Sequence, residues 1–96
     1  MTTARLRPLF SPGTVLVSPD AQEILASGGV NVQELLLRHV AADWDPGMDE
    51  ELTVTNRQAI AEGGAIISTW QLGGYTLWIR TDAARETTII DLPLDN

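Results

Sequence analysis

A glycine pair, Gly73-Gly74, constrains the fold of this 96-residue chain more than any other feature of its sequence. The pair separates two runs rich in β-branched and aromatic residues, at positions 65–72 and 75–81. A two-residue hairpin turn of the primed type requires positive φ angles, which glycine adopts without steric cost. The sequence therefore predicts two antiparallel strands joined by a tight turn at the glycine pair.

Two helices are predicted ahead of this hairpin from their start and stop signals. A serine-proline pair at positions 18–19 supplies a cap and an N1 proline to the first helix, and a glycine pair at 28–29 ends it. Asn31 caps the second helix, predicted over residues 32–43, in which apolar residues recur at helical spacing. One side of this second helix is therefore expected to face the core.

A third helix and two further strands complete the predicted order. Residues 13–19 form a β-branched strand closed by proline, and residues 87–93 form the last strand. Residues 49–62 have apolar positions at helical spacing and precede another glycine pair. The order β-α-α-α-β-β-β predicts a single small α+β domain, with an antiparallel β meander packed on helices. We assign residues 13–96 to this domain and residues 1–12 to a flexible N-terminal arm.

Charge and cysteine content exclude several classes of function. The chain carries 13 acidic and 6 basic residues, for a formal net charge of −7, and it lacks cysteine. Nucleic-acid binding depends on clustered cations, so we expect no nucleic-acid partner. Without cysteine there is neither a disulfide framework nor a thiolate metal site, which suits a cytoplasmic protein. No segment resembles a signal peptide or a membrane span, so we expect no membrane partner.

Residues 38–51, R-H-V-A-A-D-W-D-P-G-M-D-E-E, gather the only histidine with a tryptophan and several carboxylates. His39 and Asp43 are four residues apart, a spacing that places both side chains on the same side of a helix. With Arg85 as an anion clamp, they form a candidate polar site for a small ligand or for hydrolysis. The competing interpretation is structural, because the helix dipole favours a histidine near a helix C-terminus without any ligand.

The same stretch predicts neither a metal site nor a cofactor. Its order D-x-D-x-G-x-D is similar to a calcium loop, but Trp44 and Pro46 occupy alternate positions and the required glutamate is missing. A single histidine without cysteine disfavours transition metals. The serines lack a nucleophile elbow and an obvious base, so an enzyme is the less favoured class.

Six residues form a candidate partner-binding face, because large aromatic side chains anchor protein interfaces. They are Trp44, Asp45, Met48, Trp70, Tyr75 and Trp78. The alternative is that the aromatic residues belong to the core, where large aromatics in a small sheet usually lie. A small meander also leaves an unpaired edge strand, which favours homodimerisation through the sheet edge.

Four segments in order, H-V-A-A-D-W, N-R-Q-A-I-A-E-G-G, I-I-S-T-W and L-W-I-R-T-D-A-A-R-E-T-T-I-I-D-L-P, resemble a family of small plasmid and integrative-element proteins. Members are often labelled plasmid-related or associated with type I restriction. The resemblance spans roughly residues 15–93. Its matching positions are His39, Asp43, Trp44, Asn56, Gly63, Ser68, Trp78, Thr81, Arg85 and Thr88. The chain departs from the pattern at Asp45, where glycine is expected, and at Ala84, where an acid is expected.

The resemblance implies a cargo protein of a mobile genetic element, without an established activity. Together with the acidic composition, it leads us to expect a non-enzymatic, acidic protein-binding module that acts on a host defence or restriction complex. The partner is another protein or a second copy of the chain. The alternative is a small ligand-binding domain or hydrolase that uses His39, Asp43 and Arg85.

Overall fold

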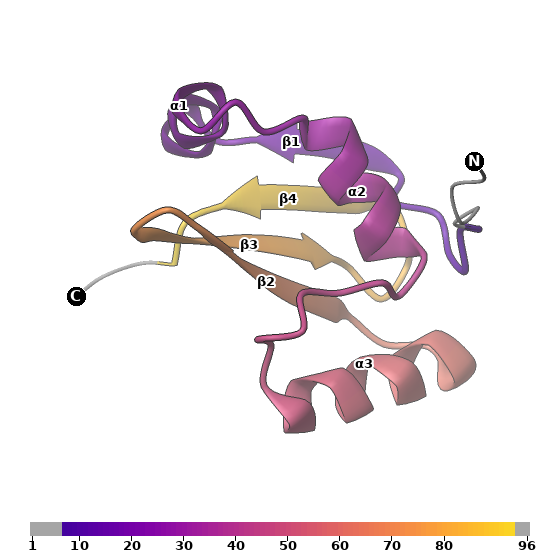
Figure 1. Cartoon of the computed structure of the whole chain (residues 1–96). Helices are drawn as coiled ribbons and strands as arrows, with labels where there is room; N and C mark the ends of the chain where they lie inside the picture. The colour runs from indigo at the N-terminus through magenta and orange to yellow at the C-terminus, as the bar shows by residue number, and fades with distance from the viewer. Residues whose placement is uncertain (1–6, 94–96) are drawn as a thin grey trace, which may run out of the picture.

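The computed structural model describes residues 7–93, which form a four-stranded sheet and three helices (Figure 1). In chain order the elements are β1 (Thr14–Val17), α1 (Pro19–Ser27), α2 (Val32–Val40), α3 (Glu50–Glu62), β2 (Ile66–Leu72), β3 (Tyr75–Thr81) and β4 (Thr87–Asp91). This order confirms the predicted α+β fold.

The strands are arranged in the spatial order β1-β4-β3-β2. Strands β2, β3 and β4 pair antiparallel in sequence order, so the predicted meander is present. Strand β1 pairs with β4 in the parallel direction, with Leu16 opposite Ile89. The long connection through three helices and the β2–β3 hairpin makes this parallel pairing possible, because parallel strands need a crossover rather than a tight turn.

Each helix begins at a side-chain cap, and the caps of α1 and α2 are the ones that the sequence predicts. In α1 the Ala21 N–H donates to the Ser18 side chain at 3.1 Å. In α2 the Gln33 N–H donates to Asn31 at 2.9 Å, and in α3 the Glu51 N–H donates to Asp49 at 2.8 Å. These bonds satisfy N–H groups that have no partner within the helix. Helix α2 ends at Val40 rather than at the predicted residue 43. The chain turns out of the helix at Ala42, whose φ is 60°.

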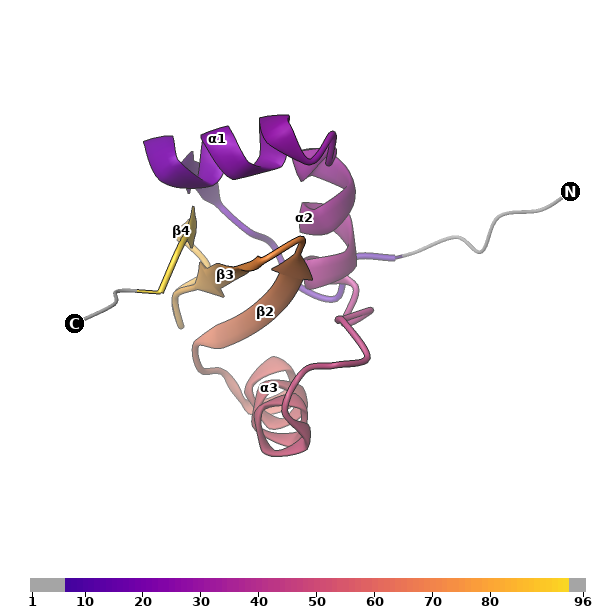
Figure 2. The same ribbon diagram turned by 60° about the vertical axis from the view of Figure 1, so that its left-hand side comes forward.

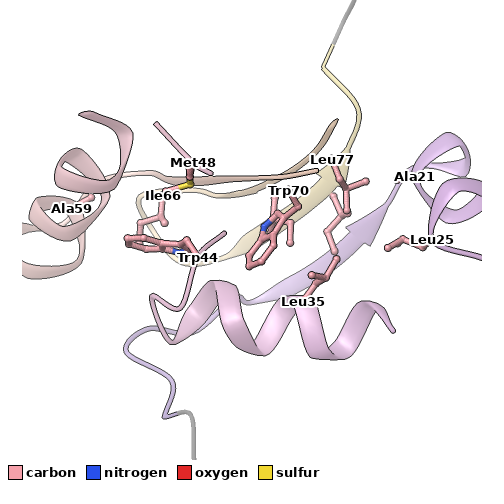
Figure 3. Packing of buried hydrophobic residues seen from close by; sticks show 11 residues of the cluster. Ala21, Leu25, Leu35, Trp44, Met48, Ala59, Ile66, Trp70 and Leu77 are labelled. Carbon is pink, nitrogen blue, oxygen red and sulfur yellow. The ribbon is translucent and has the colours of Figure 1, made fainter. Parts of the chain in front are cut away.

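One side of the sheet is buried, because alternate residues of each strand point to the same face. The fully buried side chains on this face include Ile66, Ser68, Leu77, Ile79, Thr81, Thr88 and Ile90. Helices α1 and α2 lie on this side, and α3 lies beside the edge strand β2 (Figure 2). Figure 3 shows Ala21 and Leu25 of α1 at one end of the core and Ala59 of α3 at the other.

Residues 9–12, which fall in the predicted N-terminal arm, contact the domain directly. The Leu9 N–H donates to the Val40 carbonyl at 2.7 Å. The Phe10 ring packs edge-on against the His39 ring, with 5.4 Å between their centroids. The Thr88 hydroxyl donates to the Pro12 carbonyl at 2.7 Å. Residues 1–6 of the predicted arm lie outside the described residues.

Candidate functional site

His39, the centre of the predicted polar site, is fully buried between α2 and the sheet. Its Nδ1 lies 2.6 Å from the Ser68 hydroxyl, and its Nε2 lies 2.9 Å from the Thr81 hydroxyl. Both ring nitrogens are therefore occupied by hydrogen bonds inside the protein. Serine and threonine on the buried sheet face were the partners that sequence spacing did not reveal, because they lie 29 and 42 residues away along the chain.

The hydrogen bonds around His39 form one continuous chain with a single direction. Thr88 donates to the Pro12 carbonyl, so its oxygen must accept from Thr81, which it meets at 2.7 Å. Thr81 has then used its only proton, and it accepts from the Nε2–H of His39. Nδ1 of His39 consequently carries no proton and accepts from Ser68.

Ser68 also accepts a hydrogen bond from the Trp70 indole N–H at 2.8 Å. The chain thus runs from Trp70 through Ser68, His39, Thr81 and Thr88 to the backbone, and each link satisfies a buried polar atom. Burial lowers the pKa of His39 from 6.5 to about 4, because desolvation penalises the charged imidazolium. His39 is therefore neutral at neutral pH, and it has no contact with solvent.

Asp43 and Arg85 do not join His39 in a common site, which corrects the prediction of a convergent polar cluster. The exposed Asp43 carboxylate lies in the loop after α2 and pairs with Arg38 at 3.0 Å. Arg85 donates to the backbone carbonyls of Gly64, Asp82 and Ala59, at 2.5, 3.0 and 3.1 Å. These hydrogen bonds of the guanidinium connect the β3–β4 turn to the end of α3, so Arg85 has a structural role.

The predicted aromatic partner-binding face does not form one surface. Trp44, Met48 and Trp70 are buried members of the hydrophobic core (Figure 3), which corrects their assignment to an exposed face. The Trp44 indole N–H donates to the His39 carbonyl at 3.0 Å and ties the loop after α2 to that helix. Trp78 is half-buried on the opposite side of the sheet from Trp70, because the two residues occupy different phases of the strand alternation.

The remaining predicted residues lie at the surface. Tyr75 is 57% exposed at the start of β3. Asp45 is half-buried, and its carboxylate accepts from the Gln71 N–H at 3.3 Å and from the Gly47 N–H at 2.9 Å. Asp45 thus holds a turn against the edge of β2.

The side of the sheet opposite the core has no helix over it in the described part of the chain (Figure 2). We call it the open face and define it by its four large apolar residues, Leu16, Ile67, Trp78 and Ile89, with Arg80 and Asp91 among them. The strand register places Leu16, Ile89, Arg80 and Ile67 in one row across all four strands. Trp78 is the diagonal neighbour of both isoleucines, so the apolar side chains are contiguous.

Two charged residues on the open face neutralise each other. Arg80 and Asp91 form an ion pair at 2.7 Å. Arg80 Nε and Asp91 Oδ1 are shielded from solvent and have no hydrogen-bond partner within the described chain. The open face therefore combines its four apolar side chains with a formally neutral ion pair, on a chain whose net charge is −7.

The two edge strands of the sheet differ in how many of their outward backbone groups already have side-chain hydrogen-bond partners. At the β2 edge, the buried Asn56 side chain donates to the Ile67 carbonyl at 2.6 Å and accepts from the Ile67 N–H at 3.1 Å. Asp45 blocks the same edge at Gln71. At the β1 edge, Gln22 donates to the Val17 carbonyl at 3.2 Å. An occupied edge resists pairing with another strand, so β2 is not available for sheet extension.

No metal-binding cluster of three or more histidine or acidic residues occurs within residues 7–93. None of the helices in that range is long and apolar enough to cross a membrane. Comparison with protein-family models, curated proteins and solved structures finds no match to this chain.

The sequence contains a signal for the open face that the predictions above do not include. Ile89 and Ile90 are consecutive in β4, and Trp78 and Ile79 are consecutive in β3. Neighbouring residues of a strand point to opposite faces, so each pair must place one large apolar side chain away from the core. The pairs alone would have predicted apolar residues on both sides of the sheet.

Proposed function

We propose that this protein is a non-enzymatic protein-binding module that contacts its partner through the open face. The observation that carries the proposal is a sheet face without a covering helix on which four large apolar side chains are contiguous. Leu16 and Ile89 are 53% and 36% exposed there. Contiguous exposed apolar surface on a small protein is typical of an interaction site.

The buried polar network supports a binding role over a catalytic one. His39 is the base that the hydrolase alternative requires, and it is sealed from solvent together with its hydrogen-bond partners Ser68 and Thr81. Their hydrogen bonds satisfy each other, and Arg85 binds backbone carbonyls instead of an anion. The ligand-binding or hydrolase alternative therefore lacks a site at which substrate could meet these residues.

The wider biological setting belongs to the same proposal. The motif resemblance supports a cargo protein of a mobile genetic element, and action on a host defence or restriction complex is the most specific form of the proposal. The absence of cysteine suits the cytoplasm. A second copy of the chain is one partner that fits the open face. In a symmetric dimer, Arg80 of one copy can face Asp91 of the other, because each copy presents both charges. A dimer formed through a sheet edge would have to use β1, since Asn56 and Asp45 occupy the edge of β2.

Affinity capture from a bacterial lysate, with solution sizing of the recovered complex, tests the proposal. Leu16→Glu and Ile89→Glu place a charge on the open face. Leu37→Glu is the matched control, because Leu37 is 40% exposed on α2, which lies on the other side of the sheet. Circular dichroism and thermal denaturation establish that all three variants are folded.

We expect a stoichiometric partner, either another protein or a second copy, with the wild type and with Leu37→Glu. Both open-face variants should lose it, because a buried unpaired carboxylate strongly disfavours an apolar interface. Equal recovery of the partner by all variants, or a monomer without any partner from the wild type, would contradict the proposed function.

A further inference from the structure

A groove of about 640 Å³ lies between α1 and the tight turn that joins β2 to β3. Both elements lie at the same end of the sheet (Figure 1). None of the four apolar residues of the open face lines this groove. It is therefore a second surface, independent of the one proposed above.

The groove combines apolar and acidic walls. Its half-buried apolar residues are Ile24, Val30, Leu72 and Leu92. Asp20 and Glu23 are its charged residues, both are exposed, and its lining contains no lysine or arginine. Asp20, Glu23, Ile24 and Ser27 follow one another at helical spacing, so one side of α1 presents both the acids and an apolar side chain. The helix dipole accounts for an acid at Asp20, but its effect falls off within the first turn and does not account for Glu23.

Gly73 and Gly74 line the groove on the hairpin side. A Cβ atom built on Gly73 or on Gly74 would meet no atom within 4 Å. The turn thus contributes backbone without side chains, and an incoming side chain can approach it closely.

We propose that this groove binds a lysine or arginine side chain of a protein partner. Such a side chain has an aliphatic stem, which matches Ile24, Val30 and Leu72, and a cationic head, which matches Asp20 and Glu23. A purely apolar group would gain nothing from the two acids, and an anionic group would be repelled by them. The net charge of −7 additionally steers basic partners toward this protein.

Amide chemical shifts of the ¹⁵N-labelled full chain, titrated with acetyl-Leu-Lys-Leu-amide, test this assignment. The control peptide replaces lysine by norleucine, which lacks only the ammonium group. We expect saturable shifts at Ser27, Gly28, Gly73 and Gly74 with the lysine peptide, and weaker binding as salt is raised. The double variant Asp20→Asn, Glu23→Gln should bind roughly fivefold more weakly, as expected for the loss of two exposed ion pairs.

Glu34→Gln is the matched variant, because Glu34 is an exposed acid in the first turn of α2 and lies outside the groove. It should bind the lysine peptide like the wild type, and so should Ile89→Glu, which separates this site from the open face. Equal shifts with the norleucine peptide, shifts centred elsewhere, or no saturable shift at all would overturn the proposal. The spectrum itself reports whether each variant is folded.

Discussion

The buried neutral histidine predicts a specific loss of stability in mild acid. Burial lowers the pKa of His39 to about 4 in the folded protein, while the unfolded chain retains the ordinary value of 6.5. The unfolded state therefore binds a proton more readily than the folded state. The contribution of neutral His39 to the free energy of unfolding is therefore fully present above pH 6.5. This contribution falls as the pH drops below 6.5 and levels off below about pH 4.

The two pKa values determine the size of the effect. The full shift corresponds to about 3 kcal/mol, at about 1.4 kcal/mol for each pKa unit. Between about pH 7 and pH 5, the free energy of unfolding should fall by about 2 kcal/mol. His39 is the only histidine, so a variant that lacks it isolates the contribution of the imidazole.

Urea denaturation followed by tryptophan fluorescence at several pH values measures the effect. His39→Gln is the control variant, since its amide is neutral throughout this range. It should be less stable at neutral pH, because the hydrogen bonds to Ser68 and Thr81 are disturbed, but its stability should change little between pH 7 and pH 5. A wild-type stability that is constant across this window, or an equal pH dependence in His39→Gln, would refute the buried neutral histidine.

Three further predictions concern the contacts that hold the fold. Thr88→Val is nearly isosteric and should cost about 1–3 kcal/mol in urea denaturation, because Thr81 and the Pro12 carbonyl lose their partner; an unchanged midpoint would contradict the directed chain. Asn56→Ala should cost about 2–3 kcal/mol and increase aggregation in light scattering, because it exposes the backbone of Ile67 at the β2 edge; Gln58→Ala on the exposed side of α3 is its control. Gly13→Ala should lower the thermal midpoint, because the φ of 66° is unfavourable for alanine and its Cβ would overlap the Glu86 carbonyl; an unchanged midpoint would show that this close approach relaxes freely.

The two proposed surfaces differ in their physical character. The open face carries four large apolar side chains and a neutral ion pair, whereas the groove beside α1 carries two acids without a cation. Binding at the open face should therefore depend weakly on salt, and binding at the groove should weaken as salt rises. This difference allows the contributions of the two surfaces to one partner to be separated.

Local signals in the sequence determined the elements of this protein. The caps at Ser18 and Asn31 and the glycine pair after β2 act through bonds and dihedral angles within a few residues, so the sequence predicted them without tertiary information. The cap at Asp49 is equally local, but it was not predicted. The order of strands and helices followed from such local signals, and with it the α+β class and the antiparallel meander. The end of α2 was predicted three residues too late, because Ala41 and Ala42 carry no stop signal of their own.

Only the tertiary structure decided which face of each element is buried and which distant residues meet. Trp44, Met48 and Trp70 enter the core because α2 and the loop after it pack on one side of the sheet, a choice that their identities do not encode. His39 meets Ser68 and Thr81 rather than Asp43, because the sheet presents hydroxyl groups directly beneath it. Parallel pairing of β1 with β4 places Leu16 beside Ile89 and creates the open face. These contacts join residues far apart in the chain, and their free energy depends on packing and burial rather than on local sequence.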